Sequence, residues 1–303
     1  MGLVAGVDIG SITAKTVLMD REGRLLAQRV VHQGIVNEAA ARACLEATLR
    51  QVGVSQEDLD FIVTTGYGRS LVSFGHKNIT EISCHGRGAH YLFPEVRTVI
   101  DIGGQDSKVI SLDAEGRVAA FNMNDKCAAG TGRFMEVMCR ALGVALEDMG
   151  RLSLTSTSPA QVSSLCTVFA ESEIVSLSAQ GYPLVDIIAG LHEAIGRRLQ
   201  SLVKGVGVRP TVMMSGGVAK NQGVVKVLER LLSTPIIVPP EPQIVGALGA
   251  ALYALEEVKS PASKDKNKAP SSLPLKKVPP LKPLDLGPNE FGWRKGLDYP
   301  KPK

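Results

Sequence analysis

Apolar and polar positions follow two similar patterns along the chain, at 4–31 and at 98–123. Each pattern predicts a strand, a glycine-containing turn, a second strand, an acidic-glycine turn and a third strand. A helical pattern follows each block, at 37–52 and 133–142. A supersecondary unit that occurs twice predicts two like-folded halves formed by duplication.

The remaining apolar segments extend this alternation. Further strands are expected at 61–65, 211–214 and 236–238, and further helices at 83–91, 167–180, 182–204, 224–232 and 245–255. Strands that alternate with helices predict an α/β fold in which helices cover the sheets. We expect an N-terminal half at 1–95, a C-terminal half at 96–257 and a tail at 258–303.

Charge separates the tail from the rest. Residues 258–303 hold eleven of the 34 Lys and Arg, four of the 30 Asp and Glu and nine of the 17 Pro, so their net charge is +7 while residues 1–257 carry −3. The tail shows no apolar periodicity, and this composition predicts a disordered, partly polyproline segment. We expect it to be a solvated extension and not a nucleic-acid-binding arm.

Composition also excludes whole classes of protein. No window approaches the ~18 consecutive apolar residues of a membrane span. Met1 leads directly into the first predicted strand, which argues against a signal peptide. Five Cys in 303 residues are too few, and odd in number, for a disulfide-stapled secreted fold. We therefore expect a cytoplasmic protein.

The two glycine turns carry the first chemical signal. The sequence DIGSITAK begins at Asp8, and DIGGQDSK begins at Asp101, so an acidic residue at a strand end twice precedes a glycine turn. Glycine lets the backbone approach an anion, and successive N–H groups can bind phosphate oxygens. A carboxylate at each strand end suits a hydrated Mg²⁺. One copy would favour an ordinary hairpin, whereas two copies favour a phosphate clamp.

A third glycine pair follows the strand expected at 211–214. Gly216 and Gly217 precede Ala219, Lys220 and Asn221, where a helix is about to start. Such a turn lets an adenosine lie against the backbone. The chain contains neither the GxxxxGK[ST] phosphate loop nor a GxGxxG motif that opens a βαβ unit.

Two cysteines lie close to predicted helix starts. Cys127 precedes the helix at 133–142 and Cys166 precedes the helix at 167–180. Helix N-termini favour thiolates, but free cysteines are often merely buried, and no CxxCxxC ferredoxin run is present. From spacing alone, packing is the better interpretation. Cys44 and Cys139 are expected in the core, as is Cys84, and the five His show no metal-ligand spacing.

Several strings together are similar to a known family. They are VDIGSITAK, TTGYGR, EISCHGRGA, DIGGQDSK, NDKCAAGTGRFMEVM, CTVFAESEIVSLSAQG, DIIAGLHEAI, SGGVAKNQGVV and PQIVGALGAA, and the resemblance spans about residues 4–255. The chain resembles the activators of 2-hydroxyacyl-CoA dehydratases (component A, or archerases), which are BadF/BadG-type ATPases of the sugar kinase, Hsp70 and actin superfamily. The resemblance implies a duplicated, ribonuclease H-like fold with ATP between the halves.

The resemblance also implies site residues. The residues expected to bind ATP are Gly10, Ser11, Ile12, Thr13, Ala14, Lys15, Thr65, Gly66, Gly103, Gly104, Gln105, Gly216, Gly217, Ala219, Lys220, Asn221 and Gln243. Asp8 and Asp101 are the expected catalytic carboxylates and hold Mg²⁺ through water, and Gln105 is a candidate for orienting the attacking water. Cys127 and Cys166 are implied to hold one [4Fe–4S] cluster together with the same pair from a second copy.

The activity implied is ATP hydrolysis that drives a low-potential electron into a partner enzyme. The expected partners are a second copy of the chain, a ferredoxin or flavodoxin as donor, and an iron–sulfur dehydratase or reductase as acceptor. The motifs are shared among activators with different acceptors. The alternative is a sugar kinase of the N-acetylglucosamine type, with the same clamp and no cluster. A non-enzymatic, actin-like assembly protein is a weaker third possibility.

Overall fold

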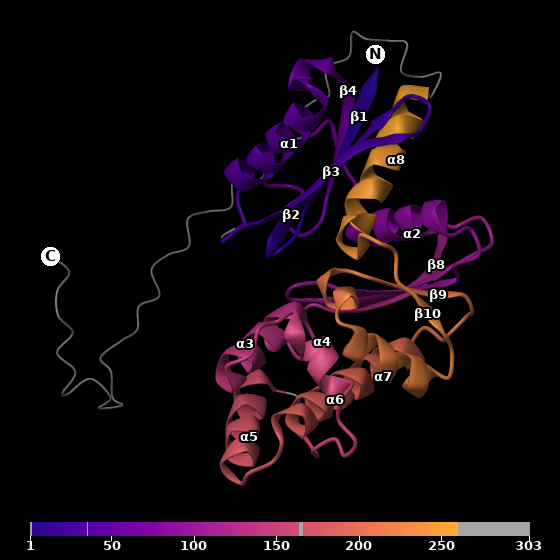
Figure 1. Ribbon diagram of the computed structural model, residues 1–303. Helices are drawn as coiled ribbons and strands as arrows, with labels where there is room; N and C mark the ends of the chain where they lie inside the picture. The colour runs from indigo at the N-terminus through magenta and orange to yellow at the C-terminus, as the bar shows by residue number, and fades with distance from the viewer. Residues whose placement is uncertain (1, 35, 164–165, 260–303) are drawn as a thin grey trace, which may run out of the picture. The chain divides into compact units, whose positions relative to one another are not determined.

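The computed structural model describes residues 2–34, 36–163 and 166–259. Within them the chain forms two five-stranded sheets and the helices that pack on them, and the two sheets lie one above the other in Figure 1. The tail predicted at 258–303 lies outside the described residues except for its first two positions. Those two residues are the end of the last helix.

Both sheets have the same connectivity. The strands of the first are β1 (Leu3–Ile9), β2 (Thr13–Asp20), β3 (Leu25–His32), β4 (Leu59–Thr65) and β5 (Lys77–Asn78), and those of the second are β6 (Thr98–Ile102), β7 (Ser107–Leu112), β8 (Val118–Asn124), β9 (Val212–Ser215) and β10 (Ile236–Ile237). The strand orders are β3-β2-β1-β4-β5 and β10-β9-β6-β7-β8. In each sheet the first strand pairs antiparallel with the second and parallel with the fourth. The predicted duplication and α/β class are therefore confirmed.

Burial explains which strands are central. Every residue of β1 and of β6 is buried, as expected for strands covered on both faces, and both read as apolar runs in the sequence. The edge strands β3 and β8 are mostly half-buried or exposed. The charged residues of β1 and β6, Asp8 and Asp101, lie near the carboxyl ends of these strands. Those ends are therefore the place to look for function.

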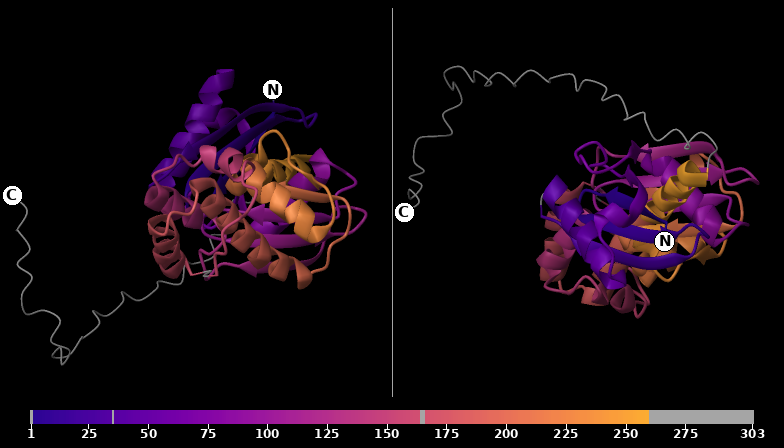
Figure 2. Two further views of the ribbon diagram at one scale, coloured as in Figure 1. Left: turned by 60° about the horizontal axis from the view of Figure 1, so that its bottom comes forward. Right: turned by 90° about the horizontal axis from the view of Figure 1, so that it is seen from above.

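Helices form layers around the two sheets (Figures 1 and 2). They are α1 (Glu38–Val52), α2 (Glu81–Leu92), α3 (Gly132–Leu142), α4 (Asp148–Ser153), α5 (Thr167–Ala179), α6 (Leu184–Lys204), α7 (Gln222–Leu232) and α8 (Val245–Lys259), with short 3₁₀ turns η1 (Gln56–Asp58), η2 (Gly217–Lys220) and η3 (Pro242–Ile244). Helix α1 packs on one face of the first sheet and α8 on the other. Helix α2 joins α8 to the second sheet, and α3 to α7 share a core on the far face of that sheet.

The expected elements are present, and most of their ends agree within two residues. Helix α8 runs to Lys259, four residues beyond its expected end. It packs on β1 and β4, so a helix from the end of the predicted C-terminal half completes the core of the first sheet. The short elements α4 and β5 were not expected. No helix within the described ranges is long and apolar enough to cross a membrane.

Candidate functional site

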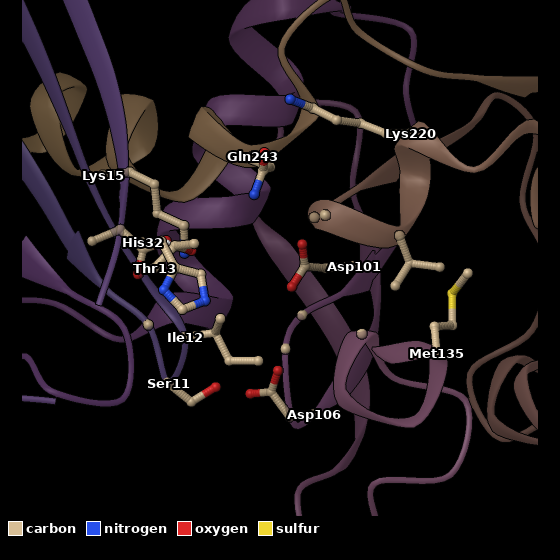
Figure 3. A pocket seen from close by; sticks show the side chains of 18 of the residues that line it. Ser11, Ile12, Thr13, Lys15, His32, Asp101, Asp106, Met135, Lys220 and Gln243 are labelled. Carbon is tan, nitrogen blue, oxygen red and sulfur yellow. Dashed lines mark ion pairs between the residues drawn. The ribbon is translucent and has the colours of Figure 1, made fainter. Parts of the chain in front are cut away.

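A cavity of about 380 Å³ opens where the glycine turns of the two halves face each other. Figure 3 shows Ser11, Ile12 and Thr13 on one side and Asp101 and Asp106 facing them, with Lys220 and Gln243 farther along the same space. The residues of the glycine turns and their flanks that line it are Asp8, Gly10, Ser11, Ile12, Thr13, Lys15, Asp101, Gly103, Gly104, Asp106, Lys108, Gly216, Gly217, Lys220, Asn221 and Gln243. The cavity thus collects the three separated sequence motifs.

The β1–β2 turn is closed by one backbone hydrogen bond, from Gly10 N to Thr13 O at 3.0 Å. Below it, Asp8 and Lys15 lie opposite each other on adjacent strands, with Lys15 Nζ 3.1 Å from Asp8 Oδ2. The side chain of Lys15 keeps 13% of its surface exposed. Because Lys15 also lines the cavity, its ammonium group is partly accessible from there.

The β6–β7 turn repeats that geometry. Gly103 N donates to Asp106 O at 3.0 Å, and Asp101 lies opposite Lys108. Lys108 is 2% exposed, and its ammonium lies 2.9 Å from Asp106 Oδ2, 3.2 Å from Glu81 Oε2 and 3.3 Å from Asp101 Oδ2. Burial opposes the charge of Lys108, but attraction to Asp101 and the other two carboxylates outweighs it and raises the pKa of this lysine. The second turn therefore has a fully paired cation at its base.

His85, on α2, was not assigned any chemistry from the sequence, yet it lines the cavity. Its Nε2 lies 3.2 Å from Asp101 Oδ1, and its Nδ1 lies 2.9 Å from Glu81 O. Both ring nitrogens face acceptors, so both carry protons and the ring is an imidazolium. Burial opposes this charge, but attraction to Asp101 prevails and raises the pKa of His85 to about 9. Asp101 also accepts a 2.8 Å hydrogen bond from Ser215 Oγ.

These partners keep Asp101 ionised. Burial alone would raise the pKa of the Asp101 carboxyl, but His85 and then Lys108 hold it well below its usual range. Asp101 is a permanent anion with a fixed orientation. The sequence contains a signal for Lys108, because the spacing Asp-x₆-Lys of the first turn recurs in the second. No spacing signal leads to His85, since its partner Asp101 belongs to a different element.

The third motif lies at the end of β9. Gly216 has φ +84, where a side chain would be strained, and a Cβ at this position would collide with the carbonyl of Ile102. The turn can therefore pass directly over the end of β6 only as glycine. Asn221 begins α7, and its Oδ1 accepts from Val224 N at 3.1 Å. Its Nδ2 is 3.2 Å from Nε2 of the buried His192, a second histidine that sequence reasoning missed.

Five residues expected to bind ATP or to act in catalysis do not line the cavity: Ala14, Thr65, Gly66, Gln105 and Ala219. Ala14 and Ala219 are buried. Thr65 pairs with Asp8 in the sheet, and Gly66 lies against the Asp8 carboxylate, because a Cβ at Gly66 would collide with Asp8 Oδ1. Gln105 is exposed beside the second turn. Conversely, Met135, Glu136, Leu146 and Glu147 form part of the wall and were not expected there.

The five cysteines divide into two groups. Cys44, Cys84 and Cys139 are buried, as expected, whereas Cys127 is half-buried and Cys166 is exposed. Burial raises the pKa of Cys84 to about 12 and that of Cys139 to about 11, which disfavours the thiolate that metals bind. Cys166 is the N-cap residue of α5. The accessible thiols are thus the two that the resemblance assigns to a cluster.

These two thiols fit half of a four-thiolate ligand set. Within the described residues, no group of three or more His, Cys, Asp or Glu side chains is arranged to hold a metal ion. Iron–sulfur clusters of the four-iron type are usually held by four cysteines. Two accessible thiols per chain therefore suit a cluster only if a second copy supplies two more.

The segment that carries Cys127 is hydrogen-bonded to the β6–β7 hairpin at both of its ends. On one side Asn124 pairs with Ser107 in the sheet, and Asn124 Nδ2 donates to Cys127 O at 2.8 Å. On the other side the first N–H groups of α3 donate to the turn itself, from Gly132 to Gly103 O at 3.0 Å and from Arg133 to Gly104 O at 2.8 Å. Because free N–H groups at a helix start need partners, this turn caps α3.

The model of the BadF/BadG/BcrA/BcrD ATPase family matches residues 5–254. The 2-hydroxyisocaproyl-CoA dehydratase activator of Clostridioides difficile is 45% identical over 86% of this chain and 98% of its own length. The (R)-2-hydroxyglutaryl-CoA dehydratase activating ATPase of Acidaminococcus fermentans is 44% identical over 83% and 96%.

A solved structure of the Clostridium difficile activator with bound ADPNP superposes with a TM-score of 0.82 at 44% identity, over 89% of this chain and all of that one. A glucokinase of the ROK family from Streptomyces griseus reaches a TM-score of 0.51 at 15% identity, over 84% of this chain and all of that one. The second likeness concerns the fold alone.

Proposed function

Because the chain belongs to the BadF/BadG/BcrA/BcrD ATPase family, we propose that it is the ATP-hydrolysing activator of an iron–sulfur enzyme such as a 2-hydroxyacyl-CoA dehydratase. In this role it couples ATP hydrolysis to the delivery of one low-potential electron. The proposal is supported by the presence, in one chain, of a cavity lined by three glycine turns and of two accessible thiols, one of which, Cys127, lies on a segment hydrogen-bonded to a turn of that cavity. Free thiols that hold a cluster also suit a reducing cytoplasm.

The cavity supports a definite arrangement of the nucleotide. The turns at Gly10–Thr13 and Gly103–Asp106 face each other and would hold the β- and γ-phosphates, with Lys15 as the nearby ammonium. Gly216, Gly217, Lys220, Asn221 and Gln243 would hold the adenosine. Asp8 and Asp101 would hold Mg²⁺ through water, and the ion would neutralise phosphate charge. Gln105 stays a candidate for orienting water, although it lies outside the cavity lining.

Cys127 and Cys166 would hold the [4Fe–4S] cluster together with the same residues of a second copy. When bound, the cluster supplies a one-electron carrier of low potential. A ferredoxin or flavodoxin would serve as donor and an iron–sulfur dehydratase or reductase as acceptor. The hydrogen bonds from α3 to the Gly103–Gly104 carbonyls link the nucleotide to Cys127, and α3 packs against α5, which begins after Cys166. This contact supports coupling between the two sites.

The test is iron and acid-labile sulfide per chain on protein purified without oxygen. We expect about two irons per chain, four shared by two copies, and an absorption near 400 nm that bleaches with dithionite. Cys127→Ser and Cys166→Ser should each lose the cluster and keep nucleotide affinity. Cys44→Ser is the matched control, because a serine hydroxyl can keep the contacts that Cys44 makes with Thr16 and Ala14.

Two outcomes would contradict the proposal. Full iron content in both Cys127→Ser and Cys166→Ser would remove these residues as ligands. Folded, ATP-binding protein that stays iron-free after anaerobic reconstitution would favour the sugar kinase, and a screen of sugars for ATP-dependent phosphorylation would follow.

A further inference from the structure

The two phosphate turns carry the same pair of charged residues in the same register. Asp8 lies opposite Lys15 across β1 and β2, and Asp101 lies opposite Lys108 across β6 and β7. Each lysine follows its aspartate by seven positions. The duplication therefore placed one ammonium beside each of the two carboxylates at the base of the cavity.

The two lysines have nevertheless become different. Lys15 Nζ contacts one carboxylate, at 3.1 Å, and its side chain is 13% exposed. Lys108 Nζ contacts three, from Glu81, Asp101 and Asp106, and its side chain is 2% exposed. Glu81 comes from α2, so the third carboxylate reaches Lys108 from outside the hairpin. Lys15 can turn toward a phosphate, whereas the ammonium group of Lys108 is already bound by three carboxylates of the protein.

The surroundings of Lys108 resemble those of a metal ion in composition but not in spacing. Three carboxylates around one centre are the ligands that Mg²⁺ and Mn²⁺ prefer. Their oxygens lie 2.9 to 3.3 Å from the nitrogen, which suits N–H···O contacts and exceeds the roughly 2.0–2.2 Å of Mg²⁺–oxygen bonds. Accordingly, no cluster of three or more His, Cys, Asp or Glu side chains among the described residues is spaced to hold a metal ion.

Charge at the base of the cavity makes this cation necessary. The carboxylates of Asp8, Glu81, Asp101 and Asp106 face the ammonium groups of Lys15 and Lys108 and the His85 imidazolium. Four negative and three positive groups leave one negative charge. Without Lys108 the excess would be two, and it would lie largely on the carboxylates of buried Asp101 and half-buried Glu81 and Asp106, which would attract a free divalent cation.

We propose that Lys108 is a resident cation that denies Glu81, Asp101 and Asp106 to a divalent metal ion, so that Mg²⁺ enters the cavity only together with the nucleotide. The proposal rests on the proposed nucleotide role of the cavity. It makes Lys108 a positioning residue, which acts through the three carboxylates it holds, so that Asp101 reaches the Mg²⁺ that arrives with the nucleotide only through water, as Asp8 does.

The test is Mn²⁺ binding by the nucleotide-free protein, measured by loss of the EPR signal of free Mn²⁺. Lys108→Met should bind one Mn²⁺ per chain, with an affinity about tenfold or more above any weak binding by the parent. Lys15→Met removes the same charge from the duplicated position but leaves Lys108 in contact with the three carboxylates. This variant should therefore gain no Mn²⁺ site. The double variant Lys108→Met, Glu81→Gln keeps the charge balance and should also gain none.

A second measurement uses only the parent protein and so does not depend on the folding of a variant. Without nucleotide it should bind no stoichiometric Mn²⁺, and with ADPNP it should bind one per chain. A stoichiometric nucleotide-free site in the parent that Asp101→Asn abolishes would overturn the proposal, as would folded Lys108→Met that binds Mn²⁺ no better than Lys15→Met. Failure of the proposed function would instead appear as missing iron, which this titration does not measure.

Discussion

Two buried histidines near the cavity carry different charges because their partners differ. His85 faces a carbonyl and a carboxylate, so both of its nitrogens donate. His192 faces the amide of Asn221, whose oxygen already accepts from Val224 N. The Asn221 amide nitrogen must therefore donate to His192 Nε2, which has to be unprotonated. His192 thus orients Asn221 as a neutral ring.

The pH dependence of stability should reveal His192. Burial lowers its pKa to about 4, whereas in the unfolded chain it is near 6.5. As pH falls from 6.5 toward 4, the unfolded chain takes up a proton that the folded chain does not, so stability is lost. We expect about 2 kcal/mol of loss between pH 7 and pH 5 from this group. His192→Gln, which keeps an acceptor for Asn221, should lack that loss in urea unfolding.

Equal pH dependence of the free energy of unfolding in the parent and in His192→Gln would contradict this assignment. The comparison is made between the two proteins at each pH, because other groups titrate in both.

For single residues, the sequence predicts a place in the site when the interaction partner is close in the chain, and it misses residues whose partner is distant. Asp8 and Lys15 flank one glycine turn, and both were expected to line the site. His85 depends on Asp101, and His192 on Asn221, which is 29 positions away. No periodicity indicates such pairs, because the sheets and helices bring them together only in the folded chain.

Among the elements, helix α3 begins in hydrogen-bond contact with the β6–β7 turn, which is proposed to bind phosphate. The Gly132 N–H donates to Gly103 O at 3.0 Å. A Cβ at Gly132 would meet Gly103 O at 3.4 Å and Gly104 Cα at 3.5 Å, which are ordinary contacts. Alanine should therefore be accepted at this position. Proline also suits the first position of a helix, but it removes the N–H and places a ring carbon against the carbonyl.

Gly132→Pro should therefore uncouple the cysteine segment from the nucleotide. We expect MgATP to change the rate at which a chelator removes cluster iron from the parent by roughly fivefold or more, as for a coupling of about 1 kcal/mol. The change should persist in Gly132→Ala and largely disappear in Gly132→Pro, with iron content and ATP affinity retained. An unaltered response in Gly132→Pro would show that coupling takes another route.

Elements with clear boundaries were predictable, and those without them were not. Helix α1 begins after Asn37, whose side chain accepts from Ala40 N, and ends at Gly53 with φ +70, so both of its ends have sequence signals. Helix α4 has six residues and buries Met149, Gly150 and Ser153, which form no apolar stripe. Such a short helix exists because the larger helices α6 and α7 pack on it.

For the whole molecule, the duplication in sequence predicted the paired sheets, but it did not predict how they are joined. Helix α8 packs on the first sheet and against α2, while α2 also packs on the second sheet. These contacts are made by close approach of glycines, since a Cβ at Gly88 or at Gly249 would collide with the backbone of the other helix. The cavity therefore lies beside the helix pair that connects the two sheets.

The proposed shared cluster requires a surface on which two copies meet, and α5 has the composition for it. Only Ala170 and Ile174 of its 13 residues are buried. Val168 and Phe169, two and three positions after Cys166, are each 66% exposed. Exposed apolar patches mark surfaces that bind a partner. The patch beside Cys166 is therefore a candidate for the surface on which the two copies meet. A twofold axis would bring the same patch of both copies together.

Phe169→Glu should therefore give a monomer. Placing a carboxylate at the centre of a self-complementary surface brings two like charges together without water. In sedimentation we expect the parent to be a dimer and this variant a monomer that binds ATP but holds no iron after reconstitution. Phe121→Glu is the matched control: Phe121 is 56% exposed on the edge strand β8, and this variant should stay dimeric. A dimeric, iron-loaded Phe169→Glu protein would show that the copies meet elsewhere.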